Sequence, residues 1–131
     1  MRWILSKHGL PAMQTHFYAD IKANVPPRMR EIAESRLIGR PIIALVDDNR
    51  WTLVGTRGIA GIGMGPEVCC AFCEIQNMSV DNATDPDEKE HRETLILNGR
   101  DGVMRRVWLP RGKEFYAMCN LLLRWISAPA Q

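Results

Sequence analysis

The sequence predicts an α+β chain that is mainly β, with about seven short strands between an N-terminal helical segment and a long C-terminal amphipathic helix. Three observations favour this class. Polar or glycine-containing turns separate a series of β-branched runs, and residues 27–37 and 111–127 each carry apolar side chains at helical spacing. Because short hairpin turns join neighbouring strands, we expect an antiparallel sheet. The 131 residues suit one compact domain, in which we distinguish an N-terminal helical segment, 1–39, from a β-rich part with its helix, 40–131.

The N-terminal segment is expected to contain one or two helices. Residues 13–25 fit a short helix capped by Thr15. Residues 27–37 begin with a proline, which suits the first turn of a helix because the missing N–H is not needed there. Four apolar residues then form one stripe: Met29, Ile32, Ala33 and Leu37. Gly39 followed by Pro41 is a stop signal, so the second helix should end at about residue 37.

The middle of the chain changes to the composition of β-strands. Residues 41–46 and 51–56 flank the polar turn Asp47–Arg50, which predicts a hairpin. Glycines punctuate residues 57–67, where we expect a third strand that bends around a corner. The cysteine-rich run that follows and then "EIQNMSV", 74–80, predict further short strands.

The last hairpin and the terminal helix have the clearest local signals. "ETLIL" and "VMRRVWL" flank "NGRDG", in which Asn-Gly and Asp-Gly are both hairpin turn signals. In residues 111–127 one helical face is apolar, and Pro129 ends the pattern. The residues predicted on that face are Phe115, Met118, Cys119, Leu122, Trp125 and Ile126. Such a helix is suited to closing the open end of a curved sheet.

The charge and hydropathy of the sequence limit the classes of molecule that the protein is expected to bind. The formal net charge of +2 is too small to favour nucleic acid as a ligand. Residues 1–40 hold seven Lys/Arg, which leaves attachment to a membrane surface through this basic segment as one alternative function. Residues 81–93 hold six carboxylates and are expected to form a solvated loop. Neither a secretory signal nor a run of membrane-spanning length is visible, so we expect a cytoplasmic protein with reduced thiols.

Three of the four cysteines lie in "CCAFC", residues 69–73, and raise the question of a metal or redox site. Cys70 and Cys73 form a C-x-x-C pair, but no turn former stands between them and no second pair of this spacing follows. In an extended strand the two side chains would point to opposite faces. The sequence therefore favours cysteine as a small buried apolar residue. Zinc or thiol chemistry at Cys70 and Cys73 stays open as an alternative, and no cofactor is expected otherwise.

No motif of nucleophilic, phosphate-binding or metalloprotease catalysis is present, so we expect no enzyme activity. A candidate partner surface is the strand face that alternation gives to Met104, Arg106 and Trp108. Methionine, arginine and tryptophan are enriched in protein interfaces. The alternative is that the N-terminal helices cover this face.

Residues 40–127 resemble bacterial pleckstrin-homology-like (PH-like) domains. The resemblance rests on the order of four stretches: "IIALVDDNRWTLVG", "EIQNMSV", "ETLILNGRDGVMRRVWLP" and "KEFYAMCNLLLRWI". It implies a seven-stranded, partly open antiparallel barrel over 40–131, closed at one end by the C-terminal helix. It also implies a binding or assembly module without catalytic residues, which contacts a protein partner or forms an oligomer. Lipid-binding members carry basic residues in the first hairpin turn, whereas Asp47–Arg50 is mostly acidic here, so phosphoinositide is not the expected ligand.

Overall fold

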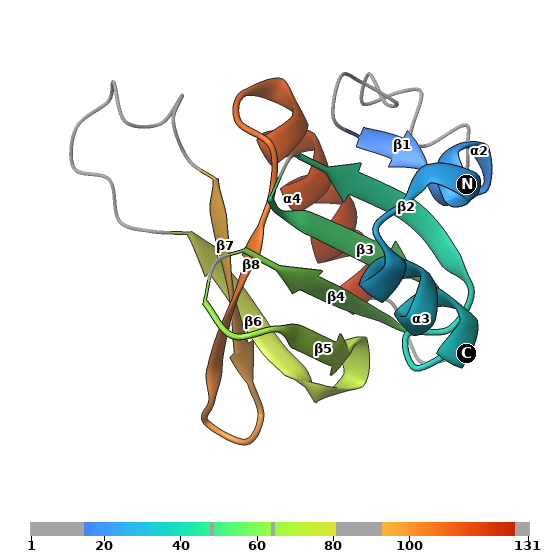
Figure 1. Cartoon of the computed structure of the whole chain (residues 1–131). Coiled ribbons are helices and arrows are strands. Elements are labelled where there is room, and N and C mark those ends of the chain that lie inside the picture. Colours follow the sequence, from blue (N-terminus) through green and yellow to red (C-terminus); the bar gives the residue numbers. More distant parts are fainter. Residues whose placement is uncertain (1–14, 48, 64, 81–92, 128–131) are drawn as a thin grey trace.

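The computed structural model describes residues 15–47, 49–63, 65–80 and 93–127, which form two antiparallel sheets with helices on both sides of the larger one (Figure 1). The strands are β1 (Thr15–Phe17), β2 (Pro41–Val46), β3 (Trp51–Gly55), β4 (Gly58–Ile62), β5 (Val68–Ala71), β6 (Ile75–Val80), β7 (Thr94–Gly99) and β8 (Met104–Trp108). The helices are α2 (Tyr18–Ile21), α3 (Pro27–Ser35) and α4 (Lys113–Ser127), with short 3-10 turns η1 (Lys22–Asn24) and η2 (Phe72–Glu74). The mainly β, antiparallel class and the C-terminal helix are therefore confirmed.

The five-stranded sheet has the order β1-β2-β3-β4-β5, and the three-stranded sheet has the order β6-β7-β8. Every residue of β3 is buried, because the larger sheet is covered on both faces. One face joins the smaller sheet and α4 in the main core, to which Leu45, Val54 and Phe115 belong. The other face packs against α2 and α3 in a second core around Met29 and Leu53. Figure 1 shows α3 and α4 on opposite sides of these strands.

The number of strands differs from the seven predicted, and the partly open barrel is not confirmed. Eight strands are present in the described residues, and they form two sheets rather than a closed barrel. The additional strand, β1, lies in the segment 13–25 that was predicted as a helix. It pairs with β2 over Thr15–Phe17, and only the next residues, in α2 and η1, are helical. Pairing with a distant strand has overridden the local helical spacing.

Helix α3 begins where it was predicted but ends two residues early. Arg36 has a positive φ of 63°, a left-handed conformation that terminates the helix. Met29, Ile32 and Ala33 are buried as the apolar stripe predicts. Leu37 was assigned to the same stripe, but it lies beyond the helix and is 65% exposed. That assignment is wrong because the stripe was extended past the true helix end.

The other local predictions have mixed outcomes. The hairpins β2–β3 and β7–β8 and strand β6 lie where they were expected. On α4, Phe115, Met118 and Leu122 are buried, while Cys119 and Trp125 pack against the core and are partly buried. The side chain of Ile126 and most of the predicted acidic loop, 81–92, lie outside the described residues. Among the helices that the structure describes, none combines the length and apolar character needed to span a membrane.

Candidate functional site

The outer face of the β7–β8 hairpin carries two of the three residues predicted to bind a partner. Met104 pairs with Asn98 across the strands, and Arg106 pairs with Ile96. Their neighbours in β8 point the other way, where Val107 belongs to the main core. Met104 is 54% exposed, and Arg106 is exposed as well. The predicted alternation is confirmed for these two residues.

The tip of this hairpin is fixed by Asp101. Its carboxylate accepts a hydrogen bond from the backbone N–H of Val103 at 3.0 Å and forms an ion pair with Arg105 at 3.0 Å. The bond from Arg105 and the bond from Val103 hold the pKa of Asp101 below its usual value. Gly102, with φ +83°, supplies the left-handed residue that the tight turn requires. Val103 is 49% exposed and stands next to Met104 on this fixed tip.

Trp108 is not part of an exposed surface, which corrects the prediction. It is 1% exposed and belongs to the main core. The Arg50 guanidinium lies 4.9 Å from the centroid of the Trp108 ring, and the Thr52 hydroxyl donates a hydrogen bond to the Trp108 carbonyl oxygen. Thr52 lies on β3 of the larger sheet, and Arg50 lies in the turn that precedes β3. The alternative that the N-terminal helices cover Trp108 is also wrong, because the apolar residues of α2 and α3 belong to the second core.

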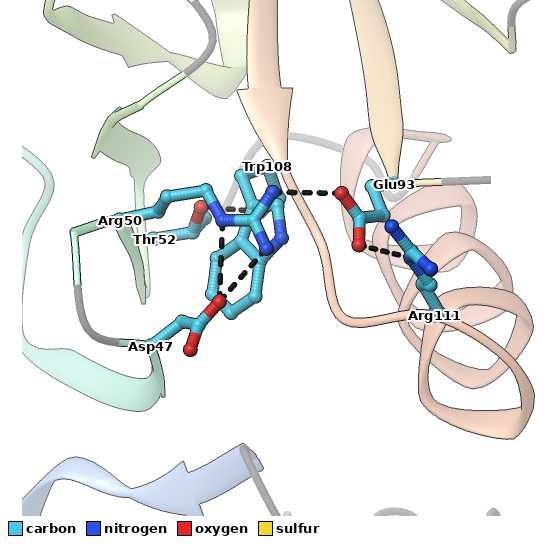
Figure 2. Close-up of polar contacts among 6 residues, drawn as sticks. All are labelled: Asp47, Arg50, Thr52, Glu93, Trp108 and Arg111. Atoms are coloured by element: carbon cyan, nitrogen blue, oxygen red, sulfur yellow. Dashed lines mark hydrogen bonds and ion pairs between the residues drawn. The ribbon is translucent and has the colours of Figure 1, made fainter. Parts of the chain in front are cut away.

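Arg50 is the centre of a network of four charged residues (Figure 2). Its guanidinium forms ion pairs with Asp47 at 2.8 Å and with Glu93 at 2.7 Å. Glu93 also accepts a hydrogen bond from Arg111, which precedes α4. Negative and positive groups therefore alternate along the network in the order Asp47, Arg50, Glu93, Arg111, and Arg50 is the member that lies over the ring of Trp108. The network joins the β2–β3 turn, the residue before β7 and the connection from β8 to α4.

This network is suited to holding the two sheets together rather than to chemistry. Each guanidinium contacts a carboxylate, so neither arginine offers a free charge to an anionic substrate. The hydrogen bonds that Arg50 donates to Asp47 and to Glu93 raise the pKa of Arg50, which keeps it charged. In the described part of the chain, Trp108 Nε1 is the one buried side-chain polar atom without a hydrogen-bond partner. Sequence reasoning placed Arg50 in a polar turn and Glu93 in a solvated loop, and no local signal joins the two.

The cysteines are placed differently from one another. Cys70 is buried on β5, as predicted for a small apolar residue, whereas Cys69 and Cys73 are exposed. Cys73 lies in η2 and not in an extended strand, so the predicted strand geometry of the C-x-x-C pair is wrong. Burial raises the pKa of the Cys70 thiol, and Glu74 adds to this effect. Partial desolvation and then Glu67 raise the pKa of Cys69, although much of that residue is exposed.

Neither a metal-binding cluster among the described residues nor similarity to a known protein indicates what the site does. Within residues 15–47, 49–63, 65–80 and 93–127, no group of three or more His, Cys, Asp or Glu side chains is arranged to hold a metal ion. Comparisons with protein-family models, with curated proteins and with solved structures each found no match to this chain.

Proposed function

We propose that the chain is a non-catalytic binding module of the PH-like type, which associates with a protein partner or a second copy through the hairpin face. This face consists of Met104 and Arg106, and the exposed Val103 adjoins it at the tip of the hairpin. The observation that carries the proposal is the exposure of two adjacent apolar side chains, Val103 at 49% and Met104 at 54%, on a turn that Asp101 holds in place. A fixed apolar tip loses little conformational entropy when a partner covers it.

The order of the elements supports the PH-like type. Leaving out β1, the remaining seven strands form a four-stranded sheet, β2 to β5, and then a three-stranded sheet, β6 to β8. Helix α4 follows them and packs into the core between the sheets. This is the sequence of elements that the resemblance implies. Strand β1 is an addition at the edge of the larger sheet, next to β2, and helix α3 packs on the face of that sheet that bears the second core.

The β2–β3 turn disfavours an inositol phosphate as the ligand at that end of the molecule. Arg50 is the only basic residue of the turn, and Asp47 and Glu93 both pair with it. An anionic head group would have to displace these carboxylates while being repelled by them. A protein partner at the hairpin face meets no such obstacle.

The test is the subunit count of the wild type and of Met104→Ser/Arg106→Ser, measured by native mass spectrometry and by light scattering over a range of concentrations. We expect a wild-type oligomer that the double substitution converts to monomer, because the exposed apolar side chain of Met104 and the charge of Arg106 are lost together. Leu123→Ser is the matched control, since Leu123 is also about half exposed, at 50%, but lies on α4. An unchanged subunit count in the double variant would exclude the hairpin face as the oligomer interface.

The same mass spectra test the alternative use of Cys70 and Cys73. A structural metal would add the mass of one zinc per chain, and chelation would unfold the protein. The proposed binding module predicts the mass of the bare chain with all four thiols free. A bare wild type that stays monomeric at every concentration would refute self-association and direct the search to a different protein partner.

A further inference from the structure

Two turns meet at the end of the larger sheet that lies opposite the β2–β3 turn. The backbone N–H of Thr56 donates to the carbonyl oxygen of Arg40, and that of Arg57 donates to Ile38, both at 2.9 Å. The Thr56 hydroxyl also accepts a bond from the N–H of Arg40 at 3.0 Å. The α3–β2 connection and the β3–β4 turn are therefore held as one unit.

Three arginines belong to this unit or lie directly beside it. Arg36, Arg40 and Arg57 are all exposed. Among the described residues, none of their guanidinium groups forms a hydrogen bond or an ion pair, in contrast to Arg28, which pairs with Glu31 and Glu67. The backbone N–H of Gly39 donates a hydrogen bond to the carbonyl oxygen of Arg36. This bond keeps Arg36 in the same turn as Arg40.

A large apolar side chain stands among these charges. Leu37, between Arg36 and Ile38, is 65% exposed, more than any other large hydrophobic residue in the described part of the chain. The close approach of the two turns depends on Gly39, which has a φ of +79°. A Cβ there would lie 2.3 Å from the Thr56 hydroxyl and 3.1 Å from Cγ of Arg57. The fold thus holds Arg57 beside the segment that presents Leu37.

We propose that Arg36, Leu37, Arg40 and Arg57, the Leu37 patch, attach the protein to the surface of an anionic lipid bilayer. The three guanidinium groups contact lipid phosphates, and Leu37 enters the boundary between head groups and acyl chains. Positive charge alone would suit any polyanion, including nucleic acid. The exposed leucine favours lipid, because a phosphate backbone offers it no apolar environment whereas a bilayer does.

The patch predicts weak and salt-sensitive attachment. Each arginine near an anionic surface contributes roughly a fivefold gain in partitioning, so three give about a hundredfold. Insertion of one leucine adds roughly tenfold. Because the ionic part is screened, a roughly tenfold rise in salt concentration should remove most of the binding.

The experiment is co-sedimentation of the full chain with two kinds of vesicle, phosphatidylcholine alone and phosphatidylcholine with about a third phosphatidylglycerol. We expect binding to the anionic vesicles only. Arg36→Gln/Arg40→Gln/Arg57→Gln should abolish this binding, and Leu37→Ala should weaken it roughly tenfold. Circular dichroism and thermal unfolding establish that each variant is folded.

A matched control is available on α4. Leu123→Ala/Arg124→Gln removes an exposed leucine and an adjacent exposed arginine from a place that lacks the other two arginines. It should bind anionic vesicles as the wild type does. The proposal would be overturned if the wild type did not co-sediment with anionic vesicles, or if the triple variant still did. Binding to a single-stranded oligonucleotide that Leu37→Ala leaves unchanged, together with unchanged vesicle binding by this variant, would assign the arginines to nucleic acid instead.

Discussion

Replacing Arg50 with alanine should destabilise the protein more than replacement of any ordinary surface arginine. The Arg50 side chain is 27% exposed and serves three partners at once. It lies over the buried ring of Trp108 at 4.9 Å, and it pairs with Asp47 and Glu93. Alanine removes all three contacts and leaves two carboxylates near one another with only Arg111 to balance them.

The size of the effect follows from these contacts. A cation–π contact with a largely desolvated ring contributes about 1 kcal/mol. Each of the two partly exposed ion pairs adds roughly 0.5–1 kcal/mol. The expected loss is therefore about 2–3 kcal/mol in the free energy of unfolding, which corresponds to a fall of roughly 10 °C in Tm for a chain of this size.

Urea unfolding followed by far-UV circular dichroism measures this loss. Arg50→Lys keeps a charge for the carboxylates but cannot lay a flat guanidinium on the ring, so it should retain only part of the stability. Arg111→Ala is the matched control, because Arg111 contacts Glu93 but is 56% exposed. It should cost well under 1 kcal/mol. If Arg50→Ala were no more destabilising than Arg111→Ala, the reasoning about the network would be refuted.

Three further predictions concern burial and charge. Trp108→Ala should cost about 3–5 kcal/mol in urea unfolding, since the ring is fully buried, and a loss below 1 kcal/mol would contradict its place in the core. The hydrogen bond from Arg28 holds the pKa of Glu67 below its usual value, so this pair stabilises the fold above the ordinary glutamate pKa of about 4.3 and is lost as pH falls through the folded value. The difference in free energy of unfolding between wild type and Arg28→Gln should therefore disappear in acid. A difference that grows as the pH falls would contradict the lowered pKa of Glu67. Thiol labelling mapped by peptide mass spectrometry should modify Cys69 in the native state and Cys70 only on unfolding. Native labelling of Cys69 should be slow at neutral pH because its pKa is raised, and rapid native labelling of Cys70 would contradict its burial.

Where structure depends on neighbours in the sequence, prediction from the sequence succeeded. The β2–β3 and β7–β8 hairpins and the apolar face of α4 each follow from turn chemistry or periodicity within a short window. The segment that became β1 has no such signal. Its three residues are extended because β2 offers an unpaired edge, and a pairing between distant segments is invisible to local periodicity.

The same limit explains the errors at the candidate site. Alternation along β8 correctly places Met104 and Arg106 on one face, and the pairing of Trp108 with Thr94 puts it in register with them. Alternation does not determine whether a residue on that face is buried, because burial depends on which other parts of the chain cover the face. Arg50 reaches Trp108 from the β2–β3 turn, which belongs to a different part of the chain. Leu37 shows the converse case, since its spacing matches the buried stripe of α3 but the helix ends before it.

The two ends of strand β3 differ in how their charges are used, and this difference connects the fold with the proposed functions. At its first end, Arg50 is neutralised by two carboxylates, and its side chain covers the core. At its other end, Arg57 and its two companion arginines have no ion-pair partner in the described residues, and an exposed leucine stands beside them. An unpaired cation retains its full attraction for an external anion, whereas a paired one must first break its contacts. The three arginines at the β3–β4 end are therefore available to an anionic surface, and binding there would leave the hairpin face free for a protein partner.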